Sequence, residues 1–142
     1  MRSVALALLL LPVAAMATDP CSAPDTTQNA TNAQGLVKQK KFQPAEAPAR
    51  AALQKCPTQA TAVWALGGSL VGQARLPDAI AAMTSAIGAK PDLAYAYLWR
   101  GQAYYQSKQP DKAVADFQQF LRLAPNAPEA VSVKQILSGL QR

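Results

Sequence analysis

The sequence of 142 residues contains no histidine and only two cysteines, Cys21 and Cys56. Without imidazole the chain lacks the usual general base of hydrolases and the commonest protein ligand of zinc, haem and copper. It contains no glycine-rich phosphate loop, and its eight acidic residues are scattered, several of them at expected helix starts and turns. We therefore expect no enzymatic activity, no metal site and no cofactor.

No apolar run after residue 17 is long enough to span a bilayer about 30 Å thick. At the start, Arg2 precedes an apolar run that ends on Ala-Met-Ala at residues 15–17, with small residues where a signal peptidase reads them. These features predict a secretory signal peptide over residues 1–17 and one mature domain over 18–142, periplasmic or secreted. The alternative is an N-terminal membrane anchor, for which the run is short.

The chain carries little charge, and its excess is positive, +6 at neutral pH. The lysines gather only at Lys38, Lys40 and Lys41, and no aromatic residues are interleaved with them. Because nucleic-acid sites combine basic residues with aromatic platforms, we interpret this cluster as a solvated turn and expect no nucleic-acid partner.

The sequence does contain an internal repeat with a period of 34 residues. The period relates glycines, prolines, alanines and apolar residues, and agreement at many positions indicates stacked helix pairs that share one core. The related sets are Pro57, Pro91 and Pro125; Ala45, Ala79 and Ala113; Leu53, Ile87 and Leu121; Gly67 and Gly101; Leu70 and Tyr104; and Met83 and Phe117.

We predict an all-α, right-handed solenoid of three antiparallel helix pairs, over residues 26–57, 60–91 and 94–125, closed by a capping helix over 127–141. The first unit is degenerate. Asparagines stand at two of its packing positions, and Pro48 should kink its second helix or delay that helix's first turn. The segment from Asn126 to Glu129 is similar to a capping box at the start of the last helix.

These residues resemble the tetratricopeptide repeat (TPR) family, over all three units. The pattern of a large apolar residue, an apolar-Gly pair, an aromatic, alanines and a final proline occurs twice. The first copy is Val63, Leu66-Gly67, Leu70, Ala79, Met83, Ala86 and Pro91; the second is Tyr97, Gly101, Tyr104, Ala113, Phe117 and Pro125. Two departures, Arg100 before the glycine and Phe120 at a small-residue position, indicate unusual packing of the last unit.

The resemblance implies a concave groove, lined by the first helix of each pair. It implies that this groove suits an extended peptide or an amphipathic helix, anchored on aromatic side chains. The alternative is that the aromatics pack against neighbouring helices, as we expect for Trp99. The implied groove residues are Trp64, Gly68, Val71, Tyr95, Leu98, Gln102 and Tyr105, with Thr27, Ala30, Gln34 and Val37 from the first unit.

Some family members grip a terminal carboxylate with lysines and asparagines in the groove. The corresponding positions here hold Trp64, Gly68, Leu98 and Gln102, so the resemblance implies no such clamp. We expect an interaction module that binds another envelope protein, as a periplasmic adaptor or assembly factor. The alternatives are a self-associating homo-oligomer and a cationic binder of anionic envelope polymers, whose binding would weaken with salt.

The two cysteines are expected to form a disulfide. In a helical hairpin the start of the first helix lies beside the end of the second, and Cys21 and Cys56 stand at those two places. Export would bring them to an oxidising compartment, where such a bond would close the weakest unit. The alternative is two free thiols.

Overall fold

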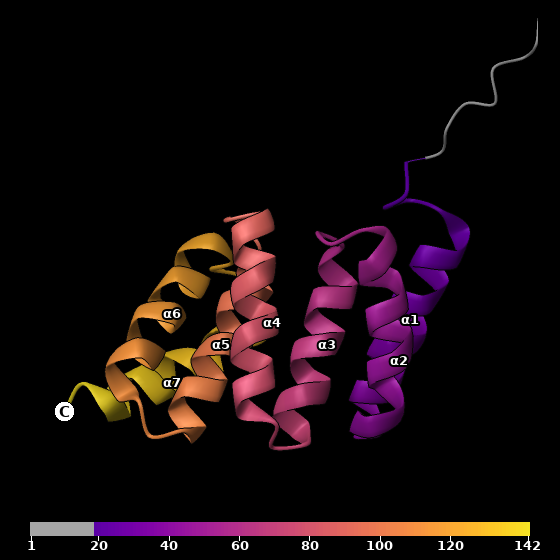
Figure 1. The fold of residues 1–142 in the computed structure, drawn as a ribbon. Helices are drawn as coiled ribbons and strands as arrows, with labels where there is room; N and C mark the ends of the chain where they lie inside the picture. The colour runs from indigo at the N-terminus through magenta and orange to yellow at the C-terminus, as the bar shows by residue number, and fades with distance from the viewer. Residues whose placement is uncertain (1–18) are drawn as a thin grey trace, which may run out of the picture.

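The computed structural model describes residues 19–142, which form seven α-helices and no strand (Figure 1). The predicted signal peptide lies outside these residues and stays a prediction. None of the described helices is long and apolar enough to cross a membrane. The helices are α1 (Pro24–Lys38), α2 (Phe42–Lys55), α3 (Ala60–Gly72), α4 (Leu76–Ala89), α5 (Ala94–Gln106), α6 (Pro110–Leu123) and α7 (Ala130–Leu140).

The helices stack as pairs along one direction, from the indigo end to the yellow end of Figure 1. The first helices α1, α3 and α5 contact one another in turn, and the second helices α2 and α4 each contact the first helix of the next pair. Each pair therefore buries its apolar side on its neighbour, and the prediction of an all-α solenoid is confirmed.

The turn inside each pair has the same geometry. Lys40, Ala74 and Lys108, spaced by the repeat period, have φ angles of 59°, 56° and 59°, in the left-handed region that usually favours glycine. The amide that follows each residue donates to a carbonyl in the last turn of the preceding helix, for example Arg75 N to Leu70 O at 2.9 Å. This is the Schellman arrangement, and it reverses the chain identically three times.

Side chains of different size occupy one core position in the three pairs. Ala49, Met83 and Phe117 are related by the period, and all three are fully buried. In the third pair the facing first helix has a glycine, Gly101, opposite the large ring, because a Cβ there would lie 2.9 Å from the Phe117 ring. Trp99, for which we expected a structural role, also packs against a glycine. Its ring lies against Gly67, where a Cβ would overlap it.

The first pair forms despite its polar sequence. The buried side of α1 consists of Thr26, Ala30, Ala33 and Val37, while Asn32 is exposed. No helix of the described chain precedes α1 in the stack, so this asparagine faces solvent. The expectation that Pro48 delays the start of α2 was wrong, since α2 begins at Phe42 and runs through this proline as one helix; a kink at Pro48 stays a prediction. Pro44, whose carbonyl loses its partner, is exposed, so water can satisfy it.

A disulfide joins Cys21, before α1, to Cys56, after α2. Their Cα atoms are 4.8 Å apart, within the usual range for disulfides, and Cys56 is buried. Lys55 and Asp25 form an ion pair beside it. The same end of the first pair is thus closed by a covalent bond and by a charge pair.

The third pair contains a buried ion pair. Arg100 donates from two nitrogens to the Asp116 carboxylate, both at 2.8 Å, and the hydrogen bonds to Asp116 raise the pKa of Arg100. Its guanidinium also lies 5.7 Å from the Tyr97 ring centre and 6.0 Å from that of Tyr104. This pair explains why a charged residue can replace the apolar residue expected before Gly101.

The last helix departs from the expected cap. We expected a helix over 127–141 with a capping box, but α7 begins at Ala130 and no side chain caps it. It buries Ala130, Val133 and Leu137, contacts α6, and runs across the other helices instead of along them (Figure 1). Because of this placement, the Glu129 side chain does not cap α7; it contacts the first helices α3 and α5 instead.

Candidate binding groove

A hollow of about 360 Å³ lies against the first helices of all three pairs, where the groove was predicted. We call it the central hollow. It combines aromatic and apolar walls with a few polar groups, which is the usual composition of a binding site. Its lining consists of Gln34 and Lys38 of α1, Ala60, Thr61 and Trp64 of α3, Tyr95 of α5, and Pro128 and Glu129 before α7.

Trp64 forms one wall of the central hollow and is held on two sides. Its ring meets Trp99 edge to face, with ring centres 5.8 Å apart and planes at 73°. Its indole N–H donates to Glu129 Oε1 at 3.4 Å. The half-buried indole is therefore fixed before any partner arrives, which lowers the entropy cost of binding.

Tyr95 forms the opposite wall. Its ring packs against Phe120, with centres 5.9 Å apart, and its hydroxyl donates to Glu129 Oε2 at 3.4 Å. Burial raises the pKa of the Tyr95 phenol, and the charge and hydrogen bond of Glu129 raise it further. The phenol is thus a proton donor at neutral pH.

Glu129 is the functional candidate that sequence reasoning missed. We assigned it to a capping box, whereas its carboxylate bridges Trp64 and Tyr95 across two helix pairs. A signal was present, because the repeat period relates Thr61, Tyr95 and Glu129, so the residue occupies a groove position of a fourth unit.

Five predicted groove residues are buried, so their assignment to the surface was wrong: Gly68, Val71 and Leu98, with Ala30 and Val37 of the first unit. Leu98 is 6% exposed and belongs to a core cluster with Val133 and Leu137, because α7 covers this part of the first-helix face. Val71 is 7% exposed and belongs to the core cluster that contains Val37, since α1 and α3 approach closely at Gly68. Both side chains stabilise the stack and offer no surface for a partner.

The structure separates the remaining groove residues. Trp64 and Tyr95 line the same central hollow, and Gln34 of the first unit lines it with them. Tyr105 is 42% exposed and lines another hollow, of about 480 Å³, with Ile136 and Leu140 of α7. Of the others, Gln102 lines neither hollow and Thr27 is exposed.

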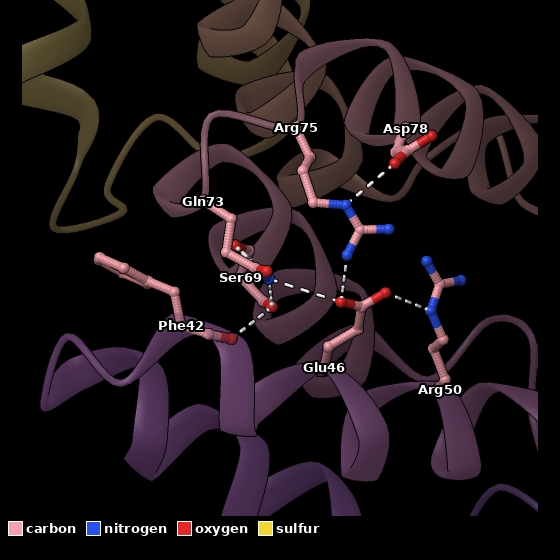
Figure 2. Close-up of polar contacts among 7 residues, drawn as sticks. All are labelled: Phe42, Glu46, Arg50, Ser69, Gln73, Arg75 and Asp78. Atoms are coloured by element: carbon pink, nitrogen blue, oxygen red, sulfur yellow. Dashed lines mark hydrogen bonds and ion pairs between the residues drawn. The ribbon is translucent and has the colours of Figure 1, made fainter.

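A second polar cluster joins the first two pairs outside the groove (Figure 2). Glu46 of α2 accepts from Arg50 at 2.8 Å and from Arg75 at 2.5 Å, and the Ser69 hydroxyl donates to Phe42 O at 2.7 Å. Burial tends to raise the pKa of Glu46, but hydrogen bonds from Arg50, Gln73 and Arg75 outweigh it and lower that pKa. The cluster is internally paired and holds α2 against the turn between α3 and α4.

Comparisons with known proteins agree with this architecture. The TPR domain of Arabidopsis OM64 is 21% identical, with a TM-score of 0.67 over 79% of this chain and 93% of that one. The Yersinia enterocolitica type III secretion translocator chaperone SycD is 14% identical, with a TM-score of 0.72 over 84% and 94%. The second TPR domain of human RPAP3, in complex with the HSP70 peptide SGPTIEEVD, is 19% identical, with a TM-score of 0.68 over 83% and 96%.

At these identities the likeness to solved structures shows the fold alone, and a search of curated proteins finds no match. Two family models, both described as tetratricopeptide repeat, match residues 66–138 and 31–94. Together they span residues 31–138, from the middle of α1 through most of α7. The chain therefore belongs to the tetratricopeptide repeat family.

Proposed function

We propose that this protein binds a peptide or helical segment of another protein in the central hollow. The observation that carries the proposal is the fixed pair of aromatic walls, Trp64 and Tyr95, on the first helices of adjacent pairs. Rigid aromatic side chains supply contact area at little cost in conformational entropy. The RPAP3 domain, whose fold is similar, is seen with a bound peptide, which supports this use of the fold.

We further propose that the protein works as an exported adaptor or assembly factor for an envelope protein. The disulfide between Cys21 and Cys56 supports an oxidising compartment, and the leader-like residues 1–17 support export. The partner differs in chemistry from an acidic peptide such as SGPTIEEVD, because the positions at which some family members hold a lysine and asparagine clamp carry Trp64, Gly68, Leu98 and Gln102 here.

The experiment is a selection of displayed random peptides on the disulfide-bonded protein, followed by affinity measurements on variants. Thr61→Arg places a long side chain in the central hollow and should abolish binding. Ser85→Arg adds the same charge on α4 and should leave binding unchanged. Trp64→Ala should weaken binding by about thirtyfold, the usual effect of losing an aromatic anchor.

Two further measurements complete this test. Tyr105→Ala removes an aromatic residue outside the central hollow and should retain the affinity of the native protein. Thermal unfolding of each variant separates lost contacts from lost folding. Selected peptides that bind Thr61→Arg as tightly as the native protein would place the binding surface elsewhere and refute the proposal.

One observation favours self-association as a second candidate function. Leu123 and Val131, in the last pair and in α7, are exposed by 36% and 66%, and a second copy that covered them would remove apolar area from water. Val131→Lys should then dissociate the oligomer in sedimentation experiments. A monomeric native protein at high concentration would eliminate this candidate.

A further inference from the structure

The charge of Glu129 has no partner within the described chain. Of the acids in residues 19–142, Glu129 alone is both partly buried and without a lysine or arginine within ion-pair distance. Asp19 and Asp111 are also unpaired, but both are exposed to water. The ion-paired acids are Asp25, Glu46, Asp78, Asp92 and Asp116.

The Glu129 carboxylate retains much of its capacity to accept hydrogen bonds. The bonds it accepts from Trp64 and Tyr95 are both 3.4 Å long, whereas a charge-assisted bond to a cation is about 2.7–2.9 Å. A carboxylate has about four acceptor sites, and these two long bonds leave the others free. A cationic donor entering the hollow would find strong acceptor sites there.

The surroundings of this carboxylate favour an organic cation over a neutral donor. Trp64 and Tyr95 contact Glu129 through their N–H and O–H groups and line the same hollow, and aromatic rings attract ammonium and guanidinium groups. Both rings are fixed from behind by Trp99 and Phe120, so they need not reorganise. Lys38 lines the same hollow but forms no ion pair with Glu129, so the position beside the carboxylate is open.

We propose that Trp64, Tyr95 and Glu129 form a cup for the side-chain cation of a lysine or arginine in the partner segment. This inference rests on the proposed function and names the chemistry of the partner. The cup supplies a negative charge and two aromatic walls, and the rest of the central hollow accommodates the alkyl stem and the adjoining backbone. The cup would thus select a basic segment, whereas the lysine and asparagine clamp of some family members selects a terminal carboxylate.

The first test repeats the selection of random peptides on three proteins. Peptides selected on the native protein should be enriched in lysine or arginine at one position. Glu129→Gln keeps the size of the side chain and removes its charge, and the enrichment should disappear. Asp111→Asn removes one negative charge from an exposed helix start outside the groove, and it should preserve the enrichment.

The second test compares two peptides on the native protein and on Glu129→Gln, so a loosening of α7 that weakens both peptides equally cancels. Replacing the enriched basic residue by norleucine retains the stem and removes the cation. With native protein, we expect the norleucine replacement to lower the affinity about fivefold to tenfold. With Glu129→Gln, the same replacement should change the affinity little. If the norleucine replacement lowered the affinity equally for native protein and for Glu129→Gln, the cup would be refuted.

The outcomes distinguish this inference from the proposed function. Peptides that require an open hollow, by the Thr61→Arg comparison, but carry no enriched basic residue would refute the cup and keep the groove. A basic enrichment that persists in Glu129→Gln would refute it equally. If no selected peptide depends on the hollow, the proposed function fails and the cup fails with it.

Discussion

The first helix pair, α1–α2, and the third, α5–α6, share a backbone plan but differ in how their cores are filled. Gly101 faces Phe117 in the third pair, and the repeat period places the fully buried Ala33 and Ala49 at the same two positions of the first. The same turn, with a left-handed residue, closes both pairs. The backbone plan of a helix pair can therefore be kept either by two small side chains or by one large side chain that faces a glycine.

The two solutions differ in stability. Alanines bury little apolar area, so the first pair gains less from the hydrophobic effect than the third, whose core contains Phe117 and Phe120. The first pair compensates with the disulfide between Cys21 and Cys56, which acts on the unfolded chain. Packing thus stabilises one end of the stack, and covalent closure stabilises the other.

The largest expected effect is that of Phe117→Ala in the third pair. Removing this fully buried ring should lower the free energy of unfolding by about 3–5 kcal/mol, because the cavity opposite Gly101 cannot refill. Urea unfolding measures the loss. The control is Ala49→Gly at the same repeat position, which should cost about 1 kcal/mol; equal costs would mean that the two cores contribute alike.

The next effect comes from removing the disulfide. Cys21→Ala with Cys56→Ala should cost about 3–4 kcal/mol in the chain-entropy model, for a sequence separation of 35. Hydrogen exchange should show that α1 and α2 lose protection while α5 and α6 keep it. Uniform loss of protection along the stack would mean that the pairs unfold together and that closure does not act locally.

A smaller, favourable effect is expected at the turns. Ala74→Gly should stabilise the protein by about 1 kcal/mol, because glycine adopts a positive φ without steric strain. Lys40→Gly and Lys108→Gly should give similar gains if the turns of the first and third pairs are equivalent. Ala81→Gly, inside α4, should instead destabilise by about 1 kcal/mol, and thermal unfolding compares all four variants.

The smallest effect concerns the joint between the first pair and the second. Because folding lowers the pKa of Glu46 below its ordinary value of 4.5, the stability that the ionised Glu46 contributes is present above that pH and is lost as pH falls through the folded pKa. Glu46→Gln should be less stable than native protein by about 0.5 kcal/mol at neutral pH. Denaturant midpoints at decreasing pH should converge below 4.5; a gap that persists in acid would exclude this linkage.

The repeat period predicted most of the fold, because glycine, alanine and proline positions are set by local packing within a pair. The positive φ at Lys40, Ala74 and Lys108 was not predicted, since the usual glycine signal is missing. The disulfide followed from hairpin geometry, which places Cys21 beside Cys56.

The groove was predicted only in part, because it depends on where α7 lies. The family resemblance placed Trp64 and Tyr95 in one groove, and both line the central hollow. It could not foresee that α7 would bury Leu98 and bring Glu129 onto both aromatics. The direction of a terminal helix is set by contacts with the whole stack, and no short sequence pattern contains that information.

The polar edge of α1 limits the symmetry of any assembly. There the Gln28 amide donates to Asn32 at 2.9 Å, so the side chains at this end of the stack satisfy each other. The opposite end exposes Val131. Head-to-tail growth would press an apolar side chain onto paired amides at every step, which disfavours an open filament. Two copies could instead meet through their C-terminal ends about a two-fold axis, so any self-association would stop at a closed dimer.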